Sequence, residues 1–378
     1  MIRVIELLVV GYVVLGMMGG VPGLSYVAIA MSVFLQLVTL IYSVLQFSSL
    51  RRGPFMLWIV NVFIITAMSV WMIFAGESLS MVLNRALSLL SVFGLVGVLS
   101  LPRLRVSMIT KMVVTTFAVI GVIIVIDSIY FLLGGSSLWP PDIYLGNRFS
   151  GPFFDPNFMA LNYAVMFLVV FFGKLFASRR RLFILGLCTF MVILGLSWSV
   201  IAVLVLSVIL GFVLKAKNYG AKQIIIVAVY LIAVPTILVS MPSLYKSFES
   251  ITGNFGVSSE ESYLKLRSFE YRVEAQDGAI SGIMGNPMGH GPQSMVQDLG
   301  RDTHNSYLGF AYELGIFGVL LIILNMTYRR KCRYVVADAL TTFIYLMALS
   351  INVHYMSIFA FIVLIVFSRD RFMIEGPA

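Results

Sequence analysis

Long apolar stretches alternate with short polar segments along the whole of this 378-residue chain. A helix needs about 20 mainly apolar residues to cross a hydrocarbon layer of roughly 30 Å. The stretch 182–214 is too long for one crossing, and Ser197-Trp198-Ser199 divides it, as Asn352 divides the last stretch. The pattern predicts twelve spans, at approximately 3–18, 22–47, 54–76, 81–101, 108–133, 155–176, 182–197, 199–214, 222–242, 304–327, 334–350 and 353–368.

Composition supports a membrane protein and excludes most soluble classes. Hydrophobic residues make up 60% of the chain and charged residues 11%, whereas an average soluble domain has roughly 25% charged residues. We therefore expect an all-α polytopic membrane protein, which excludes a soluble enzyme, a nucleic-acid binder, a disordered chain and a disulfide scaffold. Cys188 and Cys332 lie in or beside apolar stretches without metal-ligand spacing, so we expect them to be inert.

The distribution of Lys and Arg predicts the orientation of the spans, because basic residues favour the cytoplasmic side. With the N-terminus inside, every inside segment is basic, and we expect both termini in the cytoplasm. The net charge of +9 is then a topology signal and indicates no nucleic-acid partner. The N-terminal stretch lacks a clear cleavage site and is expected to be the first span. The inside basic residues are Arg3, Arg51, Arg52, Arg103, Arg105, Lys111, Lys174, Arg179, Arg180, Arg181, Lys215, Lys217, Lys222, Arg329, Arg330, Lys331, Arg333, Arg369 and Arg371.

The remaining basic residues lie in or near two outside loops, at roughly 134–154 and 243–303. The larger loop divides the chain into spans one to nine at 1–242, the loop itself at 243–303, and the last three spans with the C-terminal tail at 304–378. A transporter usually has its polar groups near the membrane midplane. Here they gather at the outer face, which favours an enzyme whose active site opens outward. These residues are Arg85, Arg148, Lys246, Lys265, Arg267, Arg272 and Arg301.

The first outside loop ends in a helix-start signal. Asp155 can accept hydrogen bonds from free backbone amides, and Pro156 suits the first helical position. Arg148 therefore precedes a helix whose positive end faces outward. Its guanidinium is suited to a two-pronged contact with a phosphate or diphosphate, and the alternative is an arginine that extends to lipid headgroups.

The second outside loop contains an amphipathic segment, at 262–284, which we expect to be a helix on the membrane-embedded body. Lys265, Arg267 and Arg272 lie in it beside three acidic residues, so a solvated and salt-bridged face is the alternative role for Lys265 and Arg267. A Gly- and Pro-rich turn at 285–292 follows, of the kind that often shapes a binding pocket.

The loop closes at His304, where span ten begins. Asp302 or Thr303 is the expected helix cap, which places His304 in the first helical turn. A helix N-terminus disfavours an imidazolium, so His304 is expected to be neutral and able to act as a general base. The alternative is a histidine that only forms hydrogen bonds at the interface. No residue spacing indicates a metal site.

Arg85, Asp127 and Glu313 are charged residues within predicted spans, and they need partners there. Arg85 and Asp127 are both about one turn from the outer end of their spans, so we expect them to pair. Glu313 lies nine residues after His304, on the opposite side of the helix, and is interpreted as structural.

Three motifs resemble the signature of the O-antigen ligase and polymerase superfamily of bacterial envelope glycosyltransferases. The first is His304-Asn305 followed after nine residues by Gly315 and then by Gly318. The second is Arg272 followed by the segment Pro287-Met288-Gly289-His290-Gly291. The third combines Arg148-Phe149-Ser150-Gly151 with Asp155-Pro156-Asn157. The chain departs from many ligases at Ser197-Trp198-Ser199-Val200 and at Val319, which weakens assignment to the ligase branch.

The resemblance implies a metal-independent, inverting transfer of a glycan from undecaprenyl diphosphate, without a cofactor, outside the cytoplasmic membrane. It implies that His304 removes the proton of the acceptor hydroxyl. Arg148 and Arg272 would hold the diphosphate leaving group, with Arg267 as a weaker candidate. Residues expected to support the site are Asn305, Tyr307, Asp155, Asn157 and Arg85.

Three functions remain open on the sequence. The leading one is a polymerase that joins lipid-linked repeat units of O-antigen or exopolysaccharide. The second is a ligase that transfers finished polymer to lipid A-core, and the third is a flippase or transporter of lipid-linked sugars. The expected partners are an undecaprenyl-diphosphate-linked oligosaccharide, an acceptor glycan or lipid A-core, membrane lipids and a chain-length regulator. The expected location is the bacterial inner membrane, with the active site facing the periplasm.

Overall fold

The computed structural model describes residues 2–18, 21, 23–47, 50–101, 104–139, 149–153, 155–173, 175–195, 197–215, 271, 274–291, 294–300, 305–327, 339–341, 343–344, 347–348, 361–362 and 365–366. All regular secondary structure in these residues is helical, which confirms the all-α class. The named helices are α1 (Ile2–Met17), α2 (Leu24–Leu45), α3 (Arg52–Phe74), α4 (Leu79–Phe93), the 3₁₀ helix η2 (Gly94–Ser100), α5 (Val106–Leu132), α6 (Pro156–Phe172), α7 (Ser178–Leu194), α8 (Trp198–Lys215), α11 (Ser294–Leu299) and α12 (Ser306–Thr327).

Five helices of the described part are long and apolar enough to cross a membrane, and α6 and α8 contribute shorter apolar segments. The spans predicted at 22–47, 54–76, 108–133 and 304–327 agree with α2, α3, α5 and α12 within a few residues. The predicted division of 182–214 is also found, because α7 ends at Leu194 and α8 begins at Trp198. The span predicted at 222–242 and most of the last two lie outside the described residues, so the total of twelve remains a prediction.

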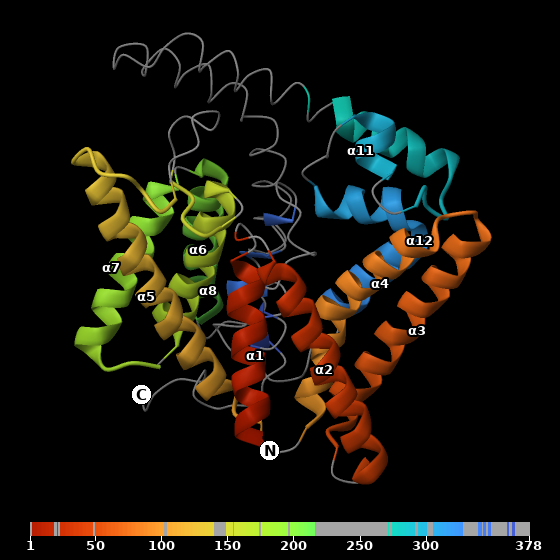
Figure 1. Ribbon diagram of the computed structural model, residues 1–378, viewed down its shortest axis with the longest axis horizontal. Helices are drawn as coiled ribbons and strands as arrows, with labels where there is room; N and C mark the ends of the chain where they lie inside the picture. The colour runs from red at the N-terminus through yellow and green to blue at the C-terminus, as the bar shows by residue number, and fades with distance from the viewer. Residues whose placement is uncertain are drawn as a thin grey trace.

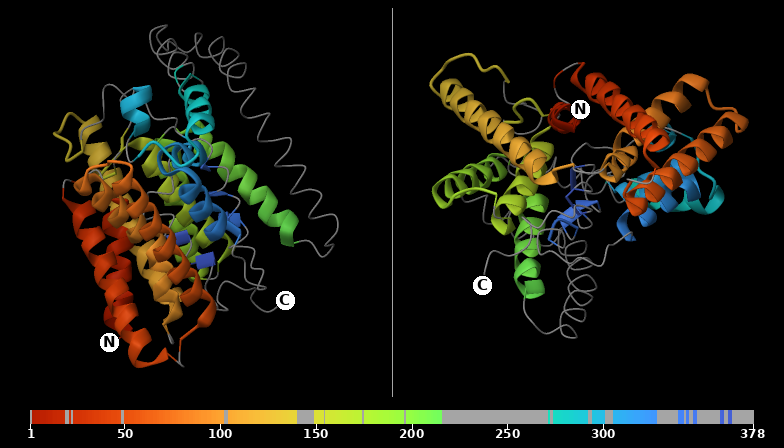
Figure 2. Two further views of the ribbon diagram at one scale, coloured as in Figure 1. Left: turned by 90° about the vertical axis from the view of Figure 1, so that its right-hand side faces the viewer. Right: turned by 90° about the horizontal axis from the view of Figure 1, so that it is seen from below.

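The described helices form two groups that α1 connects (Figure 1). One group contains α2, α3, α4, η2 and α12, and the other contains α5, α6, α7 and α8. Helix α1 packs against α2 in the first group and against α5 in the second. Seen from below, short C-terminal pieces lie between the two groups (Figure 2).

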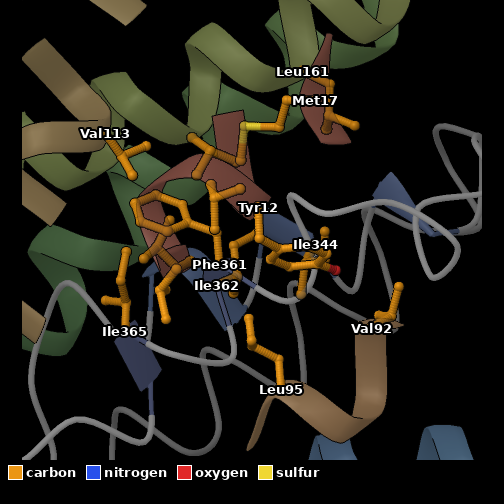
Figure 3. Packing of buried hydrophobic residues seen from close by; sticks show 14 of the residues in the cluster. Tyr12, Met17, Val92, Leu95, Val113, Leu161, Ile344, Phe361, Ile362 and Ile365 are labelled. Carbon is orange, nitrogen blue, oxygen red and sulfur yellow. The ribbon is translucent and has the colours of Figure 1, made fainter. Parts of the chain in front are cut away.

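These C-terminal pieces complete the hydrophobic core. Ile344, Phe361, Ile362 and Ile365 are buried, and they pack in one cluster with side chains from several helices. Figure 3 shows them beside Tyr12 and Met17 of α1, Val92 of α4, Leu95 of η2, Val113 of α5 and Leu161 of α6. The core therefore joins helices of both groups through the end of the chain.

Buried amide side chains fix α12 against the first helix group. Asn61 of α3 and Asn325 of α12 donate hydrogen bonds to each other's side-chain oxygen, at 3.0 and 2.8 Å. The Asn61 amide also donates to the carbonyl of Phe93, and the Asn325 amide donates to the carbonyl of Leu321. Hydrogen bonds between helices stabilise packing where the surroundings are as apolar as lipid.

Charged side chains divide between the two ends of the bundle. The end that carries the N-terminus in Figure 1 is rich in arginine and lysine, and we call it the basic end (Arg52, Arg105, Lys111, Arg179, Arg180 and Arg181). Its described acidic residue is Glu6, whose carboxylate Arg105 binds at 3.0 and 2.8 Å. The opposite end, which we call the acidic end, carries Glu77, Asp127, Asp155, Glu274, Asp277, Asp298 and Glu313.

Candidate active site

The candidate site lies at the acidic end, where an outer layer of chain contacts α12 (Figure 1). This layer consists of a helical segment at 274–285, a turn at 286–291 and the short helix α11. Ala275 and Ala279 of the segment are buried, while Glu274 and Asp277 are exposed. The segment is therefore amphipathic, and Ala279 packs with Met295 of α11 and Tyr312 of α12.

Asn305 caps the start of α12, and not Asp302 or Thr303 as the sequence led us to expect. Its side-chain oxygen accepts hydrogen bonds from the backbone amides of Tyr307 at 3.0 Å and Leu308 at 3.2 Å. Because the helix begins at Ser306, His304 precedes the cap in the chain, and the argument that placed it in the first helical turn no longer holds. Several neighbouring residues have cap-forming side chains, so sequence alone could not decide among them.

Asp155 caps α6 as predicted. Its side-chain oxygen accepts hydrogen bonds from the backbone amides of Asn157 at 2.6 Å and Phe158 at 3.2 Å, and Pro156 is the first helical residue. Asp155 and the backbone of Asn157 therefore build the helix start that follows the first outside loop. Both residues have a structural role at the acidic end.

The turn at 286–291 is joined to α12 through backbone hydrogen bonds. The amides of His290 and Gly291 donate to the carbonyls of Tyr312 and Glu313, at 2.9 and 3.0 Å. In return the amide of Ile316 donates to the carbonyl of Pro287 at 3.0 Å. These groups are available because α12 is interrupted at Gly315, which has φ 57° and ψ −143°. Backbone groups that would bond within an uninterrupted α12 are thus bonded to this turn.

Glycine is required on both sides of this contact. Gly289 has φ 98°, and a Cβ atom there would lie 2.6 Å from the backbone nitrogen of Gly315. A Cβ atom on Gly315 would overlap the carbonyl group of Met288. Positive φ values also disfavour any residue with a Cβ atom. The two glycines allow the backbones of the turn and the helix to approach each other closely.

Arg85 forms an ion pair with Glu313, so the expected pairing of Arg85 with Asp127 is wrong. The side chains of Arg85 and Glu313 are 15% and 8% exposed. Asp127 instead accepts hydrogen bonds from the Ser137 hydroxyl at 2.6 Å and from the Leu138 amide at 2.8 Å. The reason is helix order: α4 packs on α2 and α3, whereas α5 packs on α1, α6 and α7. Equal depth in the membrane did not show which helices are neighbours.

A second polar network connects the turn with α12 and α11. The His290 ring stacks on the Tyr312 ring, with centroids 4.3 Å apart and planes 9° apart. The His290 Nε2 atom is 3.0 Å from the carbonyl oxygen of Gly282, which can only accept, so this nitrogen carries a proton. The Tyr312 hydroxyl donates to the Asp298 carboxylate at 3.0 Å. Sequence analysis missed Tyr312 and Asp298, whose partners are distant along the chain.

Part of the chain that includes this region matches a known protein family. Residues 182–323 match the family model described as O-antigen ligase. This part of the chain is similar to the O-antigen ligase family. The match confirms the resemblance to the O-antigen ligase and polymerase superfamily, whose members are glycosyltransferase-type enzymes of the membrane. No curated protein and no solved structure matches the chain.

The matched stretch at 182–323 contains the whole contact between the turn and the break in α12. Together with the apolar helices, this match identifies an integral membrane protein. In the described residues no group of three or more His, Cys, Asp or Glu side chains is arranged to hold a metal ion. The expected base His304 and the expected phosphate ligands Arg148, Arg267 and Arg272 lie outside the described residues.

Among the expected supporting residues, the structure brings Arg85 to α12 through Glu313 and places Asn305 and Tyr307 at the start of that helix. Asp155 and Asn157 lie at the start of α6, in the other helix group. The structure therefore describes two capped helix starts and a turn held on α12.

Proposed function

We propose that the protein transfers a glycan from undecaprenyl diphosphate to a hydroxyl of an acceptor sugar on the periplasmic side of the inner membrane. The observation that carries this proposal is the O-antigen ligase match at 182–323, within which the Pro287–Gly291 turn packs on the break at Gly315. Both elements belong to the motifs that carry the family resemblance. His304 is the residue immediately before Asn305, which caps the same helix.

In the proposed reaction, His304 accepts the proton of the acceptor hydroxyl, and the oxygen attacks the anomeric carbon of the donor sugar. The bond between that carbon and the diphosphate oxygen breaks, and its electron pair leaves with the diphosphate. Attack opposite the leaving group inverts the anomeric centre. Arg148 and Arg272, with a contribution from Arg267, offset the charge that develops on the diphosphate, an effect worth about 3–4 kcal/mol for one well-placed donor.

The described residues contribute to this reaction by holding its parts in place. The Asn305 cap fixes the start of α12, and His304 is the residue directly before this cap. The Asp155 cap does the same for α6, which follows the loop containing Arg148. The Arg85–Glu313 ion pair connects α4 with the part of α12 that receives the turn. We propose that these contacts orient the catalytic groups toward one another.

Joining of repeat units is the first candidate activity, because Val319 and the Ser197–Val200 segment depart from many ligases. Transfer of finished polymer to lipid A-core is the second, and the description of the matching family as O-antigen ligase favours it. The two activities share their chemistry and differ in the acceptor. A chain-length regulator is a proposed partner of the first activity.

A gel of envelope glycans from a deletion strain, complemented with wild type or His304→Ala, distinguishes these activities. Acceptor that carries a single repeat unit in the mutant indicates a polymerase. Long polymer that accumulates on the lipid carrier, with bare core, indicates a ligase. An unchanged ladder from a well-expressed mutant would contradict the role of His304 and favour a transporter.

A further inference from the structure

Two cations from different helices meet at one aromatic ring at the basic end. The Lys111 ammonium of α5 lies 5.9 Å from the centre of the Phe176 ring, and the Arg180 guanidinium of α7 lies 5.5 Å from the same centre. Both basic side chains are exposed. Each contact is favourable alone, because the face of an aromatic ring attracts cations. Two positive charges around one ring repel each other, however, unless an anion lies with them.

The described part of the protein offers no such anion. Glu6, the described acidic residue of the basic end, is already bound by Arg105 through both carboxylate oxygens. The neighbouring Arg181 differs from Arg180, since its guanidinium donates to the backbone carbonyls of Val170 and Phe171 and so caps the end of α6. Within the described residues, Lys111 and Arg180 therefore have no carboxylate partner.

The depth of these residues matches the headgroup region of a membrane. Helix α5 has 27 residues and is roughly 40 Å long, so it exceeds the hydrocarbon core by about 5 Å at each end. Lys111 follows the helix start at Val106 by five residues, and its long side chain can reach back to the headgroups. Phe176 lies in the turn before α7, and Arg180 lies in the first turn of that helix.

The surface beside Arg180 is apolar. Leu182 and Phe183 of α7 are 73% and 58% exposed. Phe183 follows Arg180 by three residues, so the two lie on the same face of the helix. A ligand with a phosphate at the cations can therefore continue along α7 with an acyl chain. This continuity favours a lipid over a free phosphate.

We propose that Lys111, Phe176 and Arg180 form a binding site for the headgroup phosphate of an anionic phospholipid. The Arg180 guanidinium and the Lys111 ammonium share the two non-ester oxygens of the phosphate. The single negative charge of its phosphate reduces the repulsion between the two cations and connects α5 with α7. The acyl chains of the lipid cover Leu182 and Phe183. The site lies at the end opposite the proposed active site and does not depend on the proposed function.

Native mass spectrometry of the purified full chain, titrated with phosphatidylglycerol or phosphatidylcholine, tests this site. We expect wild type to retain phosphatidylglycerol and the Lys111→Gln/Arg180→Gln variant to bind it roughly 30-fold more weakly, from the loss of two cations at the membrane surface. Phe176→Leu, which keeps both charges, should weaken binding less than the double substitution. Arg52→Gln is the matched control, because it removes an exposed charge from the same end on another helix.

Three results would overturn the proposal. Equal phosphatidylglycerol binding by wild type and the double variant would remove these residues from any lipid site. If Arg52→Gln lost as much affinity for phosphatidylglycerol as the double variant, the lipid would be attracted to the whole basic end and not to one site. Displacement of the lipid by an equal concentration of glycerol phosphate would indicate a site for soluble phosphates. As a second measurement, phosphatidylglycerol should raise the unfolding temperature of wild type more than that of Lys111→Gln.

Discussion

Gly289 and Gly315 contact each other through their backbones, each with a positive φ angle, of 98° and 57°. Their contact joins the outer turn at 286–291 to a break in α12, and three backbone hydrogen bonds surround it. A helix break inside an apolar bundle leaves backbone groups that need partners. The turn supplies them, so the break in α12 and the conformation of the turn stabilise each other.

Substitution of either glycine should separate the turn from α12. We expect Gly289→Ala and Gly315→Ala each to lower the free energy of unfolding by at least ~2 kcal/mol, because the added Cβ atom combines a disfavoured φ with backbone overlap. Thermal unfolding of the purified protein measures the effect. Gly285→Ala is the control, since no atom lies within 4 Å of its Cβ position. Equal stability of all three variants would contradict the required contact.

The Arg85–Glu313 pair should be coupled energetically. Glu313→Gln leaves the Arg85 charge without its counter-ion in a nearly buried place, so we expect a loss of about 3–5 kcal/mol in stability. A double-mutant cycle with Arg85→Met and Glu313→Gln should show a coupling energy well above experimental error. The same cycle with Arg85→Met and Asp127→Asn should show none, because those residues bind different partners. The reverse pattern would restore the pairing expected from sequence.

The amide pair between α3 and α12 should respond differently to single and double substitution. Asn325→Leu leaves the Asn61 side-chain oxygen without its donor, and we expect a loss of about 1–2 kcal/mol. Asn61→Leu/Asn325→Leu removes both polar groups and should cost less than the sum of the single substitutions. Chemical unfolding of the three variants in detergent measures this difference. Additive losses would mean that the two amides act independently.

The two histidines of the outer region should differ in their effect on turnover. We expect His304→Ala to reduce glycan transfer on the order of 100-fold or more while the protein remains folded, as for loss of a general base. His290→Gln retains a donor for the Gly282 carbonyl and should leave most of the activity. Transfer rates of both purified variants, compared at equal expression, measure the difference. Loss of activity in His290→Gln alone would move the catalytic role to the turn.

Arg272 should require its guanidinium and not only its charge. Arg272→Lys keeps the positive charge but loses the two-pronged contact with a diphosphate, so we expect a large fall in turnover. The assay is transfer from the purified undecaprenyl-diphosphate donor, with binding of the donor measured separately. Near-normal turnover in the Lys variant would reduce Arg272 to a salt bridge within the loop.

Local features of this protein could be predicted from its amino-acid sequence. Apolar length predicted α2, α3, α5 and α12 within a few residues, because crossing a membrane depends on the composition of one segment alone. The Asp155 cap was also predictable, since the cap and the amides it binds are neighbours in the chain. The division between α7 and α8 followed from length in the same way.

Contacts between groups that are distant in the chain could not be predicted in this way. Arg85 pairs with Glu313 because α4 and α12 belong to the same helix group, whereas depth along the helices had indicated Asp127. The docking of the turn at Gly289 on Gly315 depends on backbone groups that α12 exposes only at its break. Helix order and rotation result from many side-chain contacts at once, so no single segment contains the information that selects these partners.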